Sequence, residues 1–173
     1  TRLTKEEILS TLEQIRQTII HQHNGLFLHT INNLINKIEV FGLHFASLDI
    51  RQDSSVHGKL FETLAGKGTI LPGDYSSLSQ EDKIKALSSI DSIAYPELLD
   101  DPIHRDTLKS IAAIRTIQQF NGPDGCHRYI ISQCNSALNA MEVFGLFLLN
   151  GWKPEEINID IVPLFETIDD LQN

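Results

Sequence analysis

The sequence has 173 residues, of which 41% are apolar, and its 14 Lys and Arg against 23 Asp and Glu give a formal net charge of −9. This profile is typical of one globular domain at most, with a core that needs neither disulfides nor a structural metal. The negative charge argues against general phosphate binding to nucleic acid, and no run of about 18 apolar residues predicts a membrane span.

The chain also lacks the usual marks of an exported protein. Its first residues do not have the basic-then-apolar order of a secretory signal. The two cysteines, Cys126 and Cys134, are too few for a disulfide scaffold and are not spaced as a zinc site. We therefore expect a cytoplasmic protein with two free thiols.

The first 40 residues predict a pair of antiparallel helices. Thr4 and Glu7 have the spacing of a capping box, which predicts a helix start. Apolar residues then recur at helical spacing until Asn24-Gly25, which is typical of a helix end. A second helix is expected from about Leu28 to Glu39.

The spacing of apolar residues then changes from the helical period to a period of two residues. This change predicts a strand from about Leu43 to Arg51. Alternation along this strand places Ala46, Leu48 and Ile50 on an apolar face. The opposite face carries Phe45, Ser47, Asp49 and Arg51, so it ends in charge.

A helical excursion is expected at about residues 54–120. It begins with a helix from about Ser54 to Leu64 and continues through a Gly- and Pro-rich connection to a helix capped by Ser79. Asp101-Pro102 has the cap and first-position proline of a long helix, which the turn at residues 121–125 ends.

The remaining pattern alternates between strands and a helix. Strands are expected at 129–132 and 157–165, with an apolar helix at about 136–149 between them. Such alternation predicts a helix-rich α/β fold with three parallel strands joined by crossover helices. The pattern of residues 166–171 then predicts a strand end followed by the acidic first turn of a helix.

Two charged residues lie where the strands are expected to end, and functional groups gather at this end of parallel α/β folds. Arg51 suits a phosphate or a carboxylate. Glu166 suits Mg²⁺ or Mn²⁺, which take oxygen ligands. Two structural interpretations remain open: Arg51 forms a salt bridge with Asp49 or Asp53, and Glu166 is a helix N-terminal carboxylate.

Three stretches resemble consecutive motifs of phosphoenolpyruvate carboxylase. The first is residues 41–55, with Asp-Ile-Arg-Gln at its centre, the second is Tyr129-Ile-Ile-Ser132, and the third is Val162-Pro-Leu-Phe-Glu-Thr-Ile-Asp-Asp-Leu171. The connection at residues 73–79 is also similar to that enzyme. The first and third motifs are highly specific, whereas the second is weak on its own.

The resemblance implies a central fragment of a much longer enzyme built on a (β/α)8 barrel. Residues 1–40 would be a helical pair, and residues 41–173 a partial barrel segment. The implied reaction joins phosphoenolpyruvate and bicarbonate, through carboxyphosphate and an enolate, to give oxaloacetate and phosphate. Arg51 matches the arginine that contacts phosphoenolpyruvate, and Glu166 matches a ligand of the catalytic Mg²⁺ or Mn²⁺.

The same resemblance implies limits for the isolated chain. Other groups that the family needs, including the second carboxylate ligand of the metal, lie outside these residues, so we expect the fragment alone to be inactive. Full-length relatives are homotetramers, and neither nucleic acid nor membrane is an expected partner. The alternative is a non-catalytic helical interaction or regulatory module derived from the family.

Overall fold

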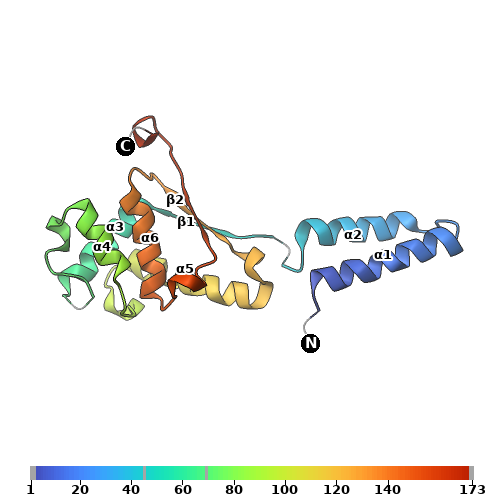
Figure 1. Ribbon diagram of the computed structural model, residues 1–173, viewed down its shortest axis with the longest axis horizontal. Coiled ribbons are helices and arrows are strands. Elements are labelled where there is room, and N and C mark those ends of the chain that lie inside the picture. Colours follow the sequence, from blue (N-terminus) through green and yellow to red (C-terminus); the bar gives the residue numbers. More distant parts are fainter. Residues whose placement is uncertain (1–2, 45, 69, 172–173) are drawn as a thin grey trace. The chain divides into compact units, whose positions relative to one another are not determined.

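The computed structural model describes residues 3–44, 46–68 and 70–171, which form two compact units, Thr1–Ser47 and Leu48–Asn173 (Figure 1). Its helices and strands are α1 (Lys5–Gln22), α2 (Leu28–Phe41), β1 (Asp49–Asp53), α3 (Ser54–Gly66), α4 (Gln80–Ser88), α5 (Pro102–Asn121), β2 (Arg128–Ser132), α6 (Ala137–Leu149) and β3 (Asp160–Pro163). Across these described ranges, no helix has the length and apolar character needed to cross a membrane.

The first unit is the predicted antiparallel pair of helices, α1 and α2. Its capping box is present, since the Thr4 hydroxyl accepts from the Glu7 amide and the Glu7 carboxylate accepts from the Thr4 amide. Asn24 and Gly25 both have positive φ, as the chain reversal requires. Lys5 Nζ donates to the Glu39 carbonyl at 3.0 Å and links the open end of the pair.

The second unit is built on a parallel sheet in the order β1-β2-β3, which confirms the three parallel strands and the helix-rich α/β class. Arg51 is the register partner of Ile130, and Ile130 is the partner of Val162. Helices α3, α4 and α5 lie in the connection from β1 to β2, and α6 lies in the connection from β2 to β3.

The predicted limits of the first strand are wrong. The strand runs over Asp49–Asp53 and not from Leu43, and Leu48 is 51% exposed instead of lying on a buried face. The ladder can form only opposite β2, which begins at Arg128 after a turn at Pro123–Gly125. Phe45, which was expected on the opposite face, lies outside the described residues.

The third strand is likewise shorter than expected. It covers Asp160–Pro163 instead of residues 157–165, because it pairs only with the four residues Arg128–Ile131 of β2. A short 3₁₀ turn at Pro154–Glu156 occupies the chain just before the expected strand start. The second strand is close to its prediction, with one residue added at Arg128.

The two faces of the sheet differ in burial. Tyr129 and Ile131 are fully buried beneath α3 and α6, where Tyr129 contacts His57 and Phe147. Alternation puts Arg51 and Ile130 on the opposite face. This second face, here called the charged face, carries the exposed residues Asp49, Arg51, Arg128 and Asp160.

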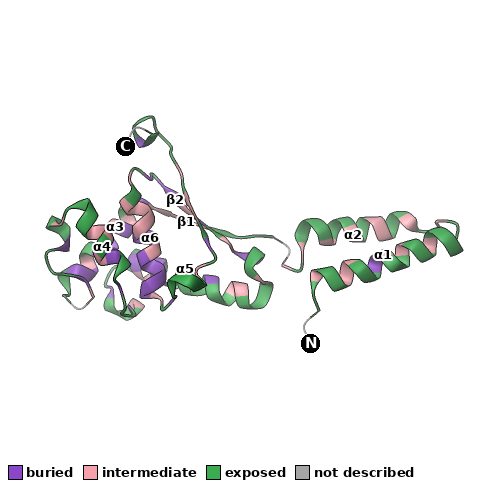
Figure 2. Ribbon diagram, in the orientation of Figure 1, coloured by how far each residue is buried: buried purple, intermediate pink, exposed green. Residues whose placement is uncertain are grey.

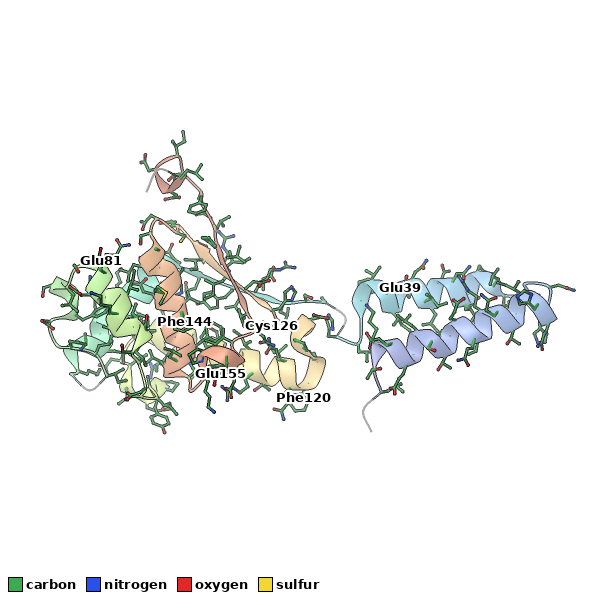
Figure 3. All side chains as sticks on the ribbon, viewed as in Figure 1. Glu39, Glu81, Phe120, Cys126, Phe144 and Glu155 are labelled. Atoms are coloured by element: carbon green, nitrogen blue, oxygen red, sulfur yellow. The ribbon has the colours of Figure 1, made fainter. Side chains whose placement is uncertain are left out.

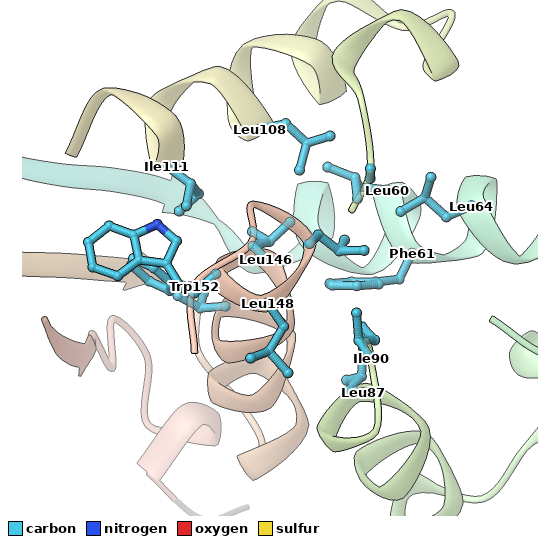
Figure 4. Close-up of a cluster of buried hydrophobic side chains, with 14 of the residues drawn as sticks. Leu60, Phe61, Leu64, Leu87, Ile90, Leu108, Ile111, Leu146, Leu148 and Trp152 are labelled. Carbon is cyan, nitrogen blue, oxygen red and sulfur yellow. The ribbon is translucent and has the colours of Figure 1, made fainter. Parts of the chain in front are cut away.

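The core lies between the sheet and the helices, as the buried segments of α3, α5 and α6 show (Figure 2). Apolar side chains from α3, α4, α5, α6 and the segment that follows α4 meet there (Figure 4), among them Leu60, Phe61, Leu64, Leu87, Ile90, Leu108, Ile111, Leu146 and Leu148. Helix α6 is buried on several sides, as its composition predicts. A Cβ added at Gly145 would lie 3.0 Å from Phe61 Cζ, so α6 approaches α3 closely at this residue.

Two polar groups are also enclosed in this core. His57 Nε2 and the Tyr129 hydroxyl are hydrogen-bonded at 2.9 Å, and burial lowers the pKa of His57 to about 4. Glu142 on α6 is 4% exposed, and Asn139 Nδ2 donates to its carboxylate at 3.2 Å. Burial raises the pKa of Glu142 to about 7, with Glu62 adding to the rise and Lys83 opposing it.

The raised pKa makes Glu142 a source of pH-dependent stability. The folded chain binds a proton at Glu142 more tightly than the unfolded chain does, so this contribution falls as the pH rises from about 4.5 to about 7. We expect Glu142→Gln to raise the free energy of unfolding by roughly 2 kcal/mol at pH 8 and by much less at pH 4. Urea denaturation at the two pH values measures this difference.

The matched control is Glu155→Gln, which neutralises an exposed carboxylate in the same unit. Its effect on the free energy of unfolding is expected to stay within about 0.5 kcal/mol at both pH values. An equal effect of Glu142→Gln at pH 4 and pH 8 would contradict the prediction.

Candidate active site

The candidate site lies at the carboxyl ends of the three strands, on the charged face of the sheet. Arg51 does not close β1 as the sequence predicts, since it is the third of five strand residues. The strand runs on to Asp53, which caps α3 by accepting from the Ser55 amide at 2.8 Å. The Ser55 side chain, with a smaller contribution from the Ser55 amide, holds the pKa of Asp53 below its usual range. Arg51 therefore reaches the end of the sheet only through its long side chain.

Glu166 follows the third strand at a distance of three residues from Pro163. The chain stays attached to β2 beyond the strand end, because the Leu164 amide donates to the Ile131 carbonyl at 2.9 Å. The Leu164 carbonyl in turn accepts from the Cys134 amide at 3.2 Å. These two hydrogen bonds hold the backbone beside the carboxyl end of β2. Glu166 follows two residues later.

Arg51 and Glu166 meet at this end of the sheet. Arg51 Nη2 donates to Glu166 Oε1 at 2.7 Å, although the two residues are 115 positions apart in the sequence. The same guanidinium donates from Nε to the Ser132 hydroxyl at 2.6 Å. The Arg51 and Glu166 side chains are 56% and 34% exposed, so solvent screens the pair and its energy is modest.

The structural interpretation of Arg51 as a partner of Asp49 or Asp53 is wrong. Asp49 faces Arg128, with 3.6 Å between Oδ2 and Nη1, and Asp53 caps α3. Both carboxylates are therefore engaged without Arg51. The guanidinium is instead directed along the sheet toward Glu166.

The turn after Glu166 is built by Asp170. Its Oδ2 accepts from the amides of Glu166 and Thr167, both at 2.9 Å, and the Asp170 amide donates to the Thr167 hydroxyl at 3.2 Å. The amide donors hold the pKa of Asp170 below its usual range. Within the described residues a short 3₁₀ turn, Asp169–Leu171, lies where the helix was expected to begin, and Glu166 lies three residues before this turn.

Glu166 has the donor chemistry that Mg²⁺ or Mn²⁺ requires, because such cations take carboxylate oxygens. One of its oxygens accepts from Arg51 in this structure. Within the described ranges there is no group of three or more His, Cys, Asp or Glu side chains arranged to hold a metal ion. Glu166 therefore fits one position of a coordination shell and does not make a metal site by itself.

Sequence reasoning assigned no contact at this site to three residues of the cluster, Ser132, Thr167 and Asp170. Ser132 is the last residue of the second motif, and the alternation of β2 would have placed it on the same face as Ile130 and Arg51. Thr167 and Asp170 have the spacing of a capping box, the same signal that located the helix start at Thr4. All three residues thus had a recognisable signal in the sequence.

The two cysteines belong to the core, and Cys134 lies close enough to Asp170 for that charge to act on its thiol. Both are free and buried, Cys126 just before β2 (Figure 3) and Cys134 just after it. Burial raises the pKa of both thiols, which keeps them in the neutral form.

The comparison with known proteins identifies the family of this chain. The family model described as phosphoenolpyruvate carboxylase matches residues 2–173. This chain belongs to the phosphoenolpyruvate carboxylase family. The phosphoenolpyruvate carboxylases of Synechocystis sp. and Gloeobacter violaceus are 33% and 30% identical to it over 177 and 174 residues.

The match to these carboxylases covers most of this chain and a small part of each relative. It covers 98% of the chain and 17% of the Synechocystis enzyme, and 96% of the chain and 18% of the Gloeobacter enzyme. The carboxylase of a Nostoc species is 33% identical over 162 residues, which are 87% of the chain and 16% of that enzyme. The chain thus spans less than a fifth of the length of these carboxylases.

Removal of the Asp170 carboxylate is expected to loosen the backbone at Glu166. In Asp170→Ala the amides of Glu166 and Thr167 lose their acceptor, and their hydrogen exchange should become about tenfold faster. Exchange measured by NMR tests this. In the unaltered chain the protection should persist on acidification and be lost only below the usual titration range of an aspartate, because the folded pKa is lowered.

Asp169→Ala is the matched control, since it removes the neighbouring exposed carboxylate of the same turn. The exchange rates of the two amides should change less than twofold in this variant. Equal acceleration in both variants would mean that the turn depends on its overall charge and not on the Asp170 cap.

Proposed function

We propose that the full-length protein that contains this chain carboxylates phosphoenolpyruvate with bicarbonate to give oxaloacetate and phosphate. The observation that carries the proposal is the meeting of Arg51 and Glu166 at the end of the sheet, 2.7 Å apart, in a member of the phosphoenolpyruvate carboxylase family. The two residues come from the first and third sequence motifs. Phosphoryl and enolate chemistry requires a fixed cation and a carboxylate close to one another.

In this proposal Arg51 binds the anionic groups of phosphoenolpyruvate. A guanidinium has five N–H donors, and the two bonds to Ser132 and Glu166 leave three of them for a phosphate or carboxylate. Negative charge moves onto phosphoryl oxygens and onto the enolate as the reaction proceeds. A cation held in place before the reaction stabilises that charge without reorganisation.

Glu166 is proposed as one ligand of a catalytic Mg²⁺ or Mn²⁺. Such an ion supplies Lewis acidity to the phosphate when it is bound. The role of this chain is to hold the carboxylate at the strand ends, which the Asp170 bonds to the Glu166 and Thr167 amides accomplish. The remaining ligands would come from beyond the described residues.

We also propose that the three strands form part of a larger (β/α)8 barrel. Two features support this proposal: β1 and β3 are the outer strands of the described sheet, and α3 and α6 contact the face that contains Tyr129 and Ile131. The charged face would then point into the barrel, with Arg51 and Glu166 at the carboxyl-end mouth. The helical pair of residues 1–40 and the segment 41–173 would be parts of one larger domain.

The proposed partners follow from this chemistry. They are phosphoenolpyruvate and bicarbonate, with neither nucleic acid nor membrane among them, and the family resemblance extends the proposal to a homotetramer. A cytoplasmic location agrees with a phosphorylated substrate and with two free thiols. The rival proposal, a non-catalytic interaction module, predicts binding of a protein partner without turnover.

Arg51→Ala in the full-length protein is expected to lower kcat/KM for phosphoenolpyruvate at least about 100-fold, because a charged hydrogen-bond donor to the substrate is lost. Steady-state kinetics of oxaloacetate formation measure the change. Arg128→Ala is the matched control, since Arg128 lies on the same face at the opposite end of the sheet. It should leave kcat/KM within about threefold, whereas unchanged kinetics of Arg51→Ala would remove Arg51 from the site.

The purified 173-residue chain is expected to produce no oxaloacetate from phosphoenolpyruvate and bicarbonate, with or without Mg²⁺ or Mn²⁺. The physical reason is that its described residues contain no group of three or more side chains arranged to hold a metal ion, and that Arg51 and Glu166 pair with one another. A coupled assay that follows oxaloacetate at high protein concentration tests this. Turnover that requires both Arg51 and Glu166 would contradict it.

A further inference from the structure

Ser132 explains how an arginine from the middle of a strand reaches the end of the sheet. In the register of β1 and β2, Arg51 lies opposite Ile130, and Ser132 lies opposite Asp53. Ser132 is thus on the same face as Arg51 but two residues nearer the carboxyl end, about 6.6 Å along the strand. The bond of 2.6 Å from Arg51 Nε to Ser132 Oγ therefore draws the side chain toward the strand ends.

The Ser132 anchor is itself fixed. Ser132 is 8% exposed, and its backbone belongs to the ladder between β1 and β2. A short side chain on a central strand has few conformations, so its hydroxyl oxygen occupies a defined position. This position contrasts with that of Glu166, which lies on a turn and is held by a neighbouring carboxylate.

The two bonds to Arg51 differ in their electrostatic effect. Glu166 carries a negative charge and partly neutralises the guanidinium, whereas a neutral hydroxyl orients the group and leaves its charge in place. Because the bond to Ser132 uses Nε, both Nη groups can still face a ligand. An anchor of this kind reduces the entropy lost when an anion binds.

We infer that Ser132 is a positioning residue that sets the direction of the Arg51 guanidinium for the anionic groups of the substrate. The inference rests on the proposed function, in which Arg51 contacts phosphoenolpyruvate. It adds a requirement for a hydroxyl at the end of the central strand, which threonine would also supply and alanine would not.

Kinetics of the full-length protein test the inference. Ser132→Ala should lower kcat/KM for phosphoenolpyruvate about tenfold, and Ser132→Thr should restore it to within about threefold. The double variant Ser132→Ala with Arg51→Ala should be no slower than Arg51→Ala alone, because Ser132 acts through Arg51. The control Ser54→Ala removes an equally buried hydroxyl that donates to the Gln133 carbonyl, and it should stay within about twofold.

A second measurement uses the 173-residue chain and does not depend on activity. Hydrogen exchange of the Arg51 Nε–H, followed by NMR, should be faster in Ser132→Ala than in the unaltered chain and in Ser132→Thr. Ser54→Ala should leave that rate unchanged. A purely structural role of Ser132 would alter the thermal midpoint without a selective change at Arg51 Nε–H.

The outcomes separate the inference from the proposed function. If Arg51→Ala leaves the kinetics unchanged, the proposed role of Arg51 is wrong and the inference fails with it. If Arg51→Ala lowers kcat/KM but Ser132→Ala does not, only the inference is overturned. Equal losses in Ser132→Ala and Ser132→Thr would also overturn it, because the hydroxyl would not be the feature that matters.

Discussion

The ladder of hydrogen bonds on both sides of β2 brings together the strand ends that carry the candidate site. Arg51 comes from one neighbour of this strand, Glu166 follows the other, and Ser132 ends the strand itself. A shift of the register by one residue would turn Arg51 to the helix-covered face. The buried contacts of Tyr129 with His57 and Phe147 hold β2 against such a shift.

The buried core and the candidate site therefore both depend on the alternation of side chains along β2. Odd and even residues of β2 face opposite sides, so that burial of Tyr129 and Ile131 leaves Ile130 and Ser132 beside Arg51. Close packing of α6 at Gly145 belongs to the same arrangement, because α6 supplies Phe147 to the face that Tyr129 occupies. A substitution in the core would thus affect the candidate site by changing the orientation of β2.

Much of this fold is readable in the sequence, because helix caps and periodicity are local signals. Thr4, Ser79 and Asp101 start helices where their side chains predict them. The strand limits were not predictable in the same way, because a strand extends only as far as its partner allows. Leu48 satisfies the alternation, yet it lies just before the ladder and is half exposed.

The residues of the candidate site could be predicted from the sequence, but the contacts between them could not. Arg51 and Glu166 were recognisable from their motifs, whereas their mutual ion pair spans 115 positions and depends on the strand order. Local candidates such as Asp49 were nearer in sequence, but a parallel sheet places them beside Arg128 instead. Long-range pairing of this kind has no signature in a single sequence.

The core of the second unit also holds a buried acid and a buried base whose titrations oppose one another. Folding keeps Glu142 protonated up to about pH 7 and His57 neutral down to about pH 4, whereas in the unfolded chain both are charged between about pH 4.5 and pH 6.5. As the pH falls in this range, the Glu142 contribution to stability grows while that of His57 shrinks. The two nearly cancel, so together they should make the free energy of folding insensitive to mild acidification.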